Sequence, residues 1–152
     1  MAEFKPRHAA GAMALAVTLV AGFEGLRQTA YRDVGGVPTV CFGETRNVHM
    51  GETKTKEECN AMLEGRLQDF MDAVSVSLTP PVPDPALAAF SSFSYNLGLG
   101  AWNKSSVRRL WNAGDRRGAC EALLKYNRAA GIVFPGLTRR REAERRLCLS
   151  GL

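Results

Sequence analysis

The sequence has only two histidines, His8 and His49, and no pair of cysteines separated by two residues. Structural zinc sites need several thiolate or imidazole ligands at short spacing. Neither histidine lies near a cysteine pair or near the other histidine. We therefore expect no metal ion and no cofactor.

The N-terminal segment falls short of the strongly apolar run of about 20 residues that a stable membrane helix needs. Residues 9–23, AAGAMALAVTLVAGF, carry no charge, but they are rich in alanine and glycine and only weakly hydrophobic. Lys5 and Arg7 precede them, as in export signals, yet no cleavage motif is followed by a plausible mature start. Two interpretations stay open: a buried first helix of the domain, or a weak anchor that enters the membrane and later leaves it to complete the fold.

Internal repeats and low-complexity tracts are absent as well, and a length of 152 residues with 23% charged residues is typical of one globular domain. The net charge of +5 favours acidic partners such as nucleic acid, anionic lipid or an acidic cell-wall polymer. Basic residues gather late in the chain, as in TRRREAERR from Thr138, but acidic residues alternate with them. We interpret that segment as a solvated helix face and expect no nucleic-acid partner.

Apolar residues recur at helical spacing through most of the chain. Thr55 and Glu58 form a capping-box signature at the start of one long helix. Asp84 is predicted to cap the next helix, with Pro85 in its first turn, and the apolar residues that follow indicate that this helix is buried. The predicted helices are 10–29, 55–78, 86–97, 105–113, 115–126 and 137–149.

The pattern changes between the first two helices, where residues 31–50 contain three glycines and a proline among short β-prone pieces such as VPTVCF. Turn formers between such pieces predict a small hairpin or meander. We therefore predict a mainly helical α+β fold in a single domain, 1–152, in which the apolar segment 1–23 leads into a β lobe. Helix 55–78 joins this β lobe to a larger helical lobe over 85–152. A cleft between two lobes is a common place for a ligand site.

Three polar residues near this β region suggest catalysis. Glu24 follows the apolar run, so desolvation is expected to raise its pKa and keep it protonated, as a general acid needs. Asp33 lies in a glycine-flanked turn and is expected to stay ionised, while the Thr39 hydroxyl on the returning strand is placed to hold a water molecule against it. An acid, a carboxylate and an oriented water are what hydrolysis of a glycosidic bond requires. Each residue also has an ordinary structural interpretation: surface carboxylate, turn former and strand residue.

The spacing of these residues, E-x8-D-x5-T, resembles that of the phage-type lysozymes, the endolysins of glycoside hydrolase family 24. FEGLRQTAYRD, GVPTVCFGET, SFSYNLGLGAW and GLTRRREAERRLC extend the resemblance over residues 10–150. It implies a lysozyme-like, two-lobed fold and a muramidase that cuts the β-1,4 bond between N-acetylmuramic acid and N-acetylglucosamine in peptidoglycan, which lyses the host cell. Glu24 matches the general acid, Asp33 the carboxylate that positions water, and Thr39 the hydroxyl that orients it. The family is usually inverting.

The resemblance also implies substrate contacts, with weaker matches. Tyr95 and Asn96 correspond to an aromatic and amide pair that faces the cleft, Ser106 to a cleft-lining serine and Thr138 to a polar residue at the start of the late helix. Tyr95 is equally well interpreted as a core aromatic and Thr138 as a helix cap. Glu44 departs from the family, because many members have a histidine in its place, GHT where this chain has GET.

The sequence alone allows the four cysteines to form two disulfides or to remain as buried thiols. The signal-anchor-release branch of these endolysins has extra cysteines and an alanine-rich and glycine-rich N-terminus. Similarity to it implies the pairs Cys41–Cys59 and Cys120–Cys148, a transient inner-membrane anchor over residues 9–23, and action in the periplasm after synthesis in the host cytoplasm. Because the apolar run ends at Glu24, membrane insertion would hold the acid away from its partners.

Other functions stay open. A catalytically inactive wall-binding or anchor protein keeps the same fold, and a lytic transglycosylase cleaves glycan without water, although Asp33 and Thr39 argue against it. A basic antimicrobial action of the arginine-rich late helix is compatible with catalysis. We expect a monomer with peptidoglycan as its substrate.

Overall fold

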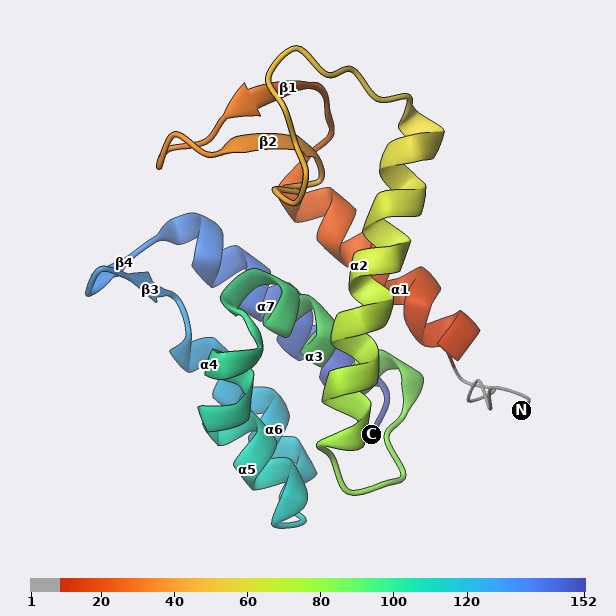
Figure 1. Ribbon diagram of the computed structural model, residues 1–152. Coiled ribbons are helices and arrows are strands. Elements are labelled where there is room, and N and C mark those ends of the chain that lie inside the picture. The colour runs from red at the N-terminus through yellow and green to blue at the C-terminus, as the bar shows by residue number, and fades with distance from the viewer. Residues whose placement is uncertain (1–8) are drawn as a thin grey trace.

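The computed structural model describes residues 9–152 (Figure 1). The charge-free segment forms helix α1, Ala9–Glu24, which buries Ala12, Ala16 and Val20 completely. The predicted extension to residue 29 is wrong, because Gly25 takes a φ of 73° and ends the helix, and a strand begins at Arg27. In the folded domain this segment is therefore a first helix with one buried face and one exposed face. Between residues 9 and 152, no helix is both long enough and apolar enough to cross a membrane.

The β lobe, residues 27–54, is built on an antiparallel hairpin of β1, Arg27–Arg32, and β2, Pro38–Cys41. The hairpin thus begins earlier than the predicted residue 31. Lys54 N donates to Gln28 O at 2.8 Å, so the chain returns along β1 before it enters the next helix. Figure 1 shows this lobe at one end of the molecule, above the helices.

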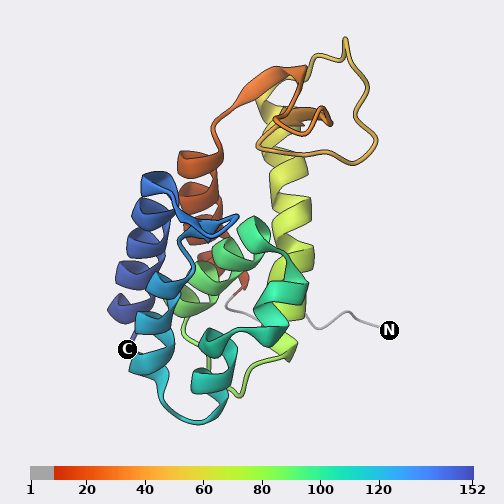
Figure 2. The ribbon, with the colours of Figure 1, turned by 90° about the vertical axis from the view of Figure 1, so that its left-hand side faces the viewer.

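Helix α2, Lys56–Val76, joins the β lobe to the remaining helices (Figures 1 and 2). The predicted capping box is confirmed: Glu58 N donates to Thr55 Oγ1, and Thr55 N donates to Glu58 Oε1, both at 3.1 Å. The buried stripe of α2 faces α1 and α3, and its members are Cys59, Leu63, Leu67, Met71 and Val74.

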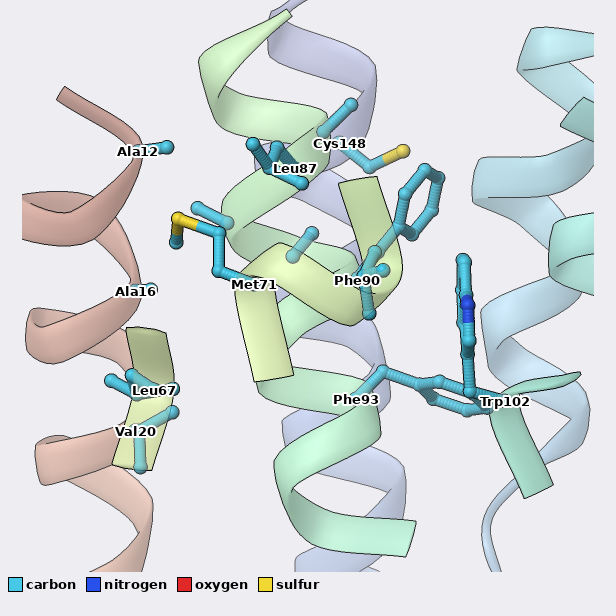
Figure 3. Packing of buried hydrophobic residues seen from close by; sticks show 14 of the residues in the cluster. Ala12, Ala16, Val20, Leu67, Met71, Leu87, Phe90, Phe93, Trp102 and Cys148 are labelled. Atoms are coloured by element: carbon cyan, nitrogen blue, oxygen red, sulfur yellow. The ribbon is translucent and has the colours of Figure 1, made fainter. Parts of the chain in front are cut away.

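Helix α3, Asp84–Leu97, is the centre of the molecule, and residues 86–94 are all buried. Asp84 lies inside the helix and Pro83 precedes it as the cap residue, so the predicted cap at Asp84 is one residue late. Helices α1, α2 and α7 pack around α3. Figure 3 shows Phe90 and Phe93 of α3 reaching Trp102, with ring centroids 5.3 and 6.2 Å away. Aromatic rings at this spacing are well placed for a rigid core.

The rest of the chain adds short helices, a second hairpin and a long final helix. The predicted helix 115–126 is divided into an α-helix and a 3₁₀ turn, and the hairpin β3–β4 is absent from the sequence-based prediction. Ala130 and Gly131 both take positive φ at its tip, as in a two-residue hairpin turn. The elements are α4 Leu99–Lys104, α5 Ser106–Asn112, α6 Arg116–Ala122, η1 Leu123–Lys125, β3 Arg128–Ala129, β4 Ile132–Val133 and α7 Pro135–Ser150.

All four cysteines form disulfides, in the two pairs that the resemblance implies. Cys41–Cys59 joins β2 to α2, with Cα atoms 4.9 Å apart. Cys120–Cys148 joins α6 to α7, with Cα atoms 5.6 Å apart. One bridge thus fixes the β lobe to the connecting helix, and the other closes the helical part of the molecule.

Candidate active site

Glu24 is the last residue of α1, and two distant segments meet its carboxyl group. Arg140 of α7 donates from Nη1 to Oε1 at 2.6 Å. Gly43, in the turn after β2, lies beside the other oxygen, because a methyl group added to its Cα would be 3.2 Å from Oε2. The Glu24 side chain keeps 23% of its surface exposed. Its carboxyl group is therefore positioned by three parts of the chain and still reaches solvent.

The surroundings of Glu24 differ from those that the sequence predicts. The apolar run predicts an apolar environment for the carboxyl group, but Ala12, Ala16 and Val20 point into the core along the earlier turns of α1. The nearest partner of the carboxyl group is instead the guanidinium of Arg140. The prediction is wrong because α1 buries one face along its length and does not surround its last residue.

A cleft of about 500 Å³ opens beside Glu24. Its polar groups include Asn96 and two neighbouring arginines of α7, and much of its remaining wall is apolar. The exposed aromatic rings at the cleft are those of Phe23 and Phe134. The lining residues are Phe23, Glu24, Asn96, Ala129, Phe134, Gly136, Leu137, Arg139 and Arg140.

Arg140 belongs to a buried network of charges between α7 and α3. Glu144 is completely buried, and its carboxylate lies 2.8 Å from Arg141 Nε and 3.5 Å from Arg140 Nε. Ser92 Oγ donates to Glu144 Oε2 at 2.6 Å. Burial raises the pKa of Glu144, while the neighbouring guanidinium groups and the Ser92 bond act in the opposite direction.

Arg141 completes this network and connects it to the cleft. Its Nη2 donates to Asn96 Oδ1 at 2.7 Å. Burial lowers the pKa of Arg141 to about 10, which leaves it charged at neutral pH. The interpretation of TRRREAERR as a solvated face is therefore wrong for Arg140, Arg141 and Glu144. The signal that was missed is the spacing of the two arginines from Glu144, which places all three on one side of a helix.

Asp33 and Thr39 lie on the hairpin of the β lobe, and the backbone of Val37 connects them. Val37 N donates to Asp33 Oδ1 at 2.8 Å, and Thr39 Oγ1 donates to Val37 O at 2.8 Å. Asp33 is half-buried and Thr39 is 3% exposed. Neither side chain lines the cleft described above. Strand β2, which carries Thr39, is followed almost at once by Gly43, and Gly43 lies beside Glu24. A short stretch of chain therefore links Asp33 and Thr39 to the neighbour of the acid.

The structure brings one of the four expected substrate contacts, Asn96, into the cleft. The Tyr95 hydroxyl instead donates to Phe42 O at 2.7 Å. Ser106 is 8% exposed and its backbone N donates to the Tyr126 hydroxyl at 2.9 Å. Thr138 lies in the first turn of α7, where its hydroxyl bonds to the Asn127 amide at 3.1 Å. Tyr95, Ser106 and Thr138 thus make hydrogen bonds within the protein and do not line this cleft.

Glu44, which stands where many family members have histidine, is 7% exposed. Its Oε1 accepts from the backbone N atoms of Thr45 and Arg46 at 3.0 and 2.9 Å, and its Oε2 lies 3.5 Å from Arg66 Nε of α2. Glu44 thus shapes the turn after Gly43 and pairs it with α2. Within residues 9–152, no cluster of three histidine, cysteine, aspartate or glutamate side chains is arranged to hold a metal ion.

Comparison with known proteins gives a consistent result. The family model described as phage lysozyme matches residues 21–144. A SAR-endolysin of bacteriophage PS119 is 38% identical over 148 residues, 93% of this chain and 89% of the relative. The crystal structure of a point mutant of P22 lysozyme has a TM-score of 0.81 at 32% identity, covering 88% of this chain and 94% of that one.

A further solved protein is known in two forms. The active form of the phage P1 endolysin Lyz has a TM-score of 0.83 at 25% identity, covering 95% of this chain and 92% of that one. Its secreted inactive form has a TM-score of 0.51 at 24% identity, over 70% and 76%. By sequence and by fold, the chain belongs to the phage lysozyme family and is a lysozyme-type hydrolase.

Proposed function

We propose that this endolysin is a muramidase that hydrolyses the β-1,4 bond between N-acetylmuramic acid and N-acetylglucosamine in peptidoglycan and so lyses the host cell. The observation that carries the proposal is the meeting of Glu24, Arg140 and Gly43 beside a cleft of about 500 Å³. Family membership supports glycan hydrolysis as the reaction class. The cleft is lined by both polar groups and aromatic rings, which suits a sugar ring with its hydroxyl edges and C–H faces.

Glu24 is proposed as the general acid that gives a proton to the leaving glycosidic oxygen. Its bond to Arg140 fixes the orientation of the carboxyl group, which matters because acid catalysis depends on hydrogen-bond reach to the leaving oxygen. The buried network around Glu144 in turn fixes Arg140. Arg140 is therefore a positioning residue for the acid.

Asp33 and Thr39 are proposed to hold the attacking water. The Thr39 hydroxyl donates its proton to Val37 O, so its lone pairs are free to accept a bond from water. Val37 N donates to Asp33 Oδ1, which leaves Oδ2 to accept a second hydrogen bond from the same water. A water held this way, opposite the leaving group, fits an inverting course.

Membrane association of α1 before activity is also part of the proposal. The exposed face of α1 carries no charged residue before Glu24, and Leu15 on that face is 37% exposed. Surface helices of globular proteins normally have charged residues on that side. The alanine-rich segment 9–23 is shorter than the roughly 20 apolar residues of a stable membrane helix, so it would anchor weakly and could leave the membrane again. The names of the SAR-endolysin relatives support this course of events.

The decisive experiment compares wild type with Glu24→Gln for release of reducing ends from purified peptidoglycan. General acid catalysis typically contributes about 10²–10⁴-fold, so we expect a loss of at least roughly 100-fold with an unchanged unfolding temperature. Equal rates for both proteins would remove Glu24 from this role. Mass spectrometry of the products separates hydrolysis from transglycosylation, because only the latter forms 1,6-anhydro ends.

The anchor is tested by cell fractionation before lysis. We expect the protein in the inner-membrane fraction first and in the periplasm later. A pool that is cytoplasmic throughout would contradict membrane association without affecting the assignment of the reaction.

A further inference from the structure

We propose that Tyr95 and Gly43 together position the Glu24 carboxyl group, as a contact between the β lobe and α3 that works from the side opposite Arg140. This inference rests on the proposed function of Glu24. Its starting point is that Tyr95 does not line the cleft, although the residue after it, Asn96, does.

The first step is the hydroxyl of Tyr95. It donates to the carbonyl of Phe42 at 2.7 Å, across 53 residues of sequence, and so joins α3 to the turn that follows β2. The ring packs edge-on against Phe70 of α2, with centroids 5.6 Å apart. Tyr95 is thus supported on two helices and has limited freedom to follow movements of the turn.

The second step is the peptide between Phe42 and Gly43, which Tyr95 holds through the Phe42 carbonyl. Gly43 has a φ of 80°, and a methyl group on its Cα would lie 3.2 Å from Glu24 Oε2. A Cβ atom this close forces its neighbour to move. Glycine is therefore required twice at this position, for its backbone conformation and for the close approach of the acid.

The third step is the arrangement of charges around the hydroxyl. Glu24, Glu44, Arg66 and Arg140 all act on Tyr95 electrostatically. Burial and the two carboxylates raise the pKa of Tyr95 to about 12, so the hydroxyl keeps its proton at neutral and mildly alkaline pH. The hydroxyl is therefore able to donate to Phe42 O at neutral pH.

Glu24 thus lies between two supports. Arg140 holds Oε1 from α7, and the Phe42–Gly43 peptide, fixed by Tyr95, limits Oε2 from the β lobe. Loosening the Phe42–Gly43 peptide changes neither the charge of Glu24 nor the residues that line the cleft. It changes only the orientation of the Glu24 carboxyl group. The expected result is a loss in kcat with little change in KM.

Two pairs of variants test this inference. Tyr95→Phe removes the hydroxyl, and Tyr126→Phe is its control, because the Tyr126 hydroxyl also bonds to a backbone group, Ser106 N at 2.9 Å, but within the helical part of the molecule. Gly43→Ala adds the methyl group beside Glu24. Gly51→Ala is its control, because Gly51 has a similar φ of 93° in the same lobe with no atom within 4 Å of the added Cβ.

We expect kcat on peptidoglycan to fall roughly 10- to 100-fold for Tyr95→Phe and Gly43→Ala, with KM within about twofold of wild type, because small displacements of a reacting group cost this much. Tyr126→Phe and Gly51→Ala should keep the wild-type kcat at a temperature where all four variants are folded. A wild-type kcat for Tyr95→Phe, or an equal fall in its control, would overturn the inference. Glu24→Gln is run alongside: if it keeps full activity, the proposed function fails, whereas an inactive Glu24→Gln with a fully active Tyr95→Phe refutes the positioning role alone.

Discussion

At the scale of single residues, a chain of charged side chains runs from the Glu24 carboxyl group into the core. Arg140 contacts Glu24, and Glu144 contacts Arg140 from a completely buried position. A buried carboxylate between two guanidinium groups is costly to remove, because two positive charges would then remain in the interior without a counter-charge.

Glu144→Gln is therefore expected to lower the free energy of unfolding by about 3–5 kcal/mol. Urea denaturation monitored by circular dichroism measures the change. Glu142→Gln is the matched control, since Glu142 is an exposed acid on the same helix. The two variants losing the same stability would contradict a special role for the buried network.

Tyr95 gives a prediction about alkaline pH. Its pKa is raised from 10.0 to about 12, so the folded protein keeps the hydroxyl proton at a pH where the unfolded chain has lost it. The contribution of the Tyr95 hydroxyl to the free energy of unfolding is fully present below pH 10 and is lost as the pH rises from 10 to about 12. Between pH 9 and pH 11, we expect the free energy of unfolding of wild type to fall by about 1 kcal/mol more than that of Tyr95→Phe. Parallel urea titrations at the two pH values measure it, and identical pH dependence in both proteins would contradict the assignment.

At the scale of elements, helix α1 has one face that packs and one that does not. Ala16 is completely buried, whereas Ala14 is exposed. Leucine at either position adds the same hydrophobicity to a membrane segment, but only Ala16→Leu overfills the core, at a cost of about 1–3 kcal/mol.

Under the proposed function, Ala16→Leu is expected to remain in the membrane fraction longer than Ala14→Leu and to lyse cells later. Fractionation and lysis timing measure the difference. If the two variants behave alike, hydrophobicity alone governs release, and packing of α1 against the folded domain contributes nothing to it.

The sequence predicts elements well where local chemistry decides. The Thr55 capping box and the buried character of α3 were predictable because each depends on neighbours in the sequence. The end of α1 at Gly25 was predicted too late, because QTAY after it also fits a helical pattern and only pairing with β2 makes it a strand. The β3–β4 hairpin has two residues in each strand, too few for any periodicity to appear.

The candidate site was predictable only in part. The spacing of Glu24, Asp33 and Thr39 carried the resemblance to the phage-type lysozymes, because all three lie within sixteen residues of sequence. Arg140 lies 116 residues from Glu24, and no local pattern reports a contact at that separation. The solvated appearance of its helix hides the contact further, because the same segment also carries the exposed arginines Arg139 and Arg146.

At the scale of the whole molecule, the two disulfides support different parts. Cys41–Cys59 closes a segment of 18 residues that contains the turn with Gly43, and Cys120–Cys148 closes 28 residues of the helical part. Each is expected to contribute about 3 kcal/mol by restricting the unfolded chain.

The two double variants are therefore expected to lose similar stability but different amounts of activity. Cys41→Ser with Cys59→Ser should lower kcat as well as the unfolding temperature, because it frees the turn beside Glu24. Cys120→Ser with Cys148→Ser should lower the unfolding temperature and leave kcat near wild type when measured well below it. Equal kcat values for the two variants would show that the β-lobe bridge has no part in holding the site.

The position of Glu24 at the last residue of α1 also restricts how this segment can evolve. Alanine-rich segments tolerate gain or loss of a residue easily as far as composition and hydrophobicity are concerned. In an α-helix, however, one added residue turns everything after it by about 100° and moves it by about 1.5 Å. An insertion between Ala16 and Glu24 would therefore rotate the carboxyl group away from Arg140 or pull the buried stripe out of register. The exposed face of this segment can therefore vary in sequence more easily than the segment can vary in length.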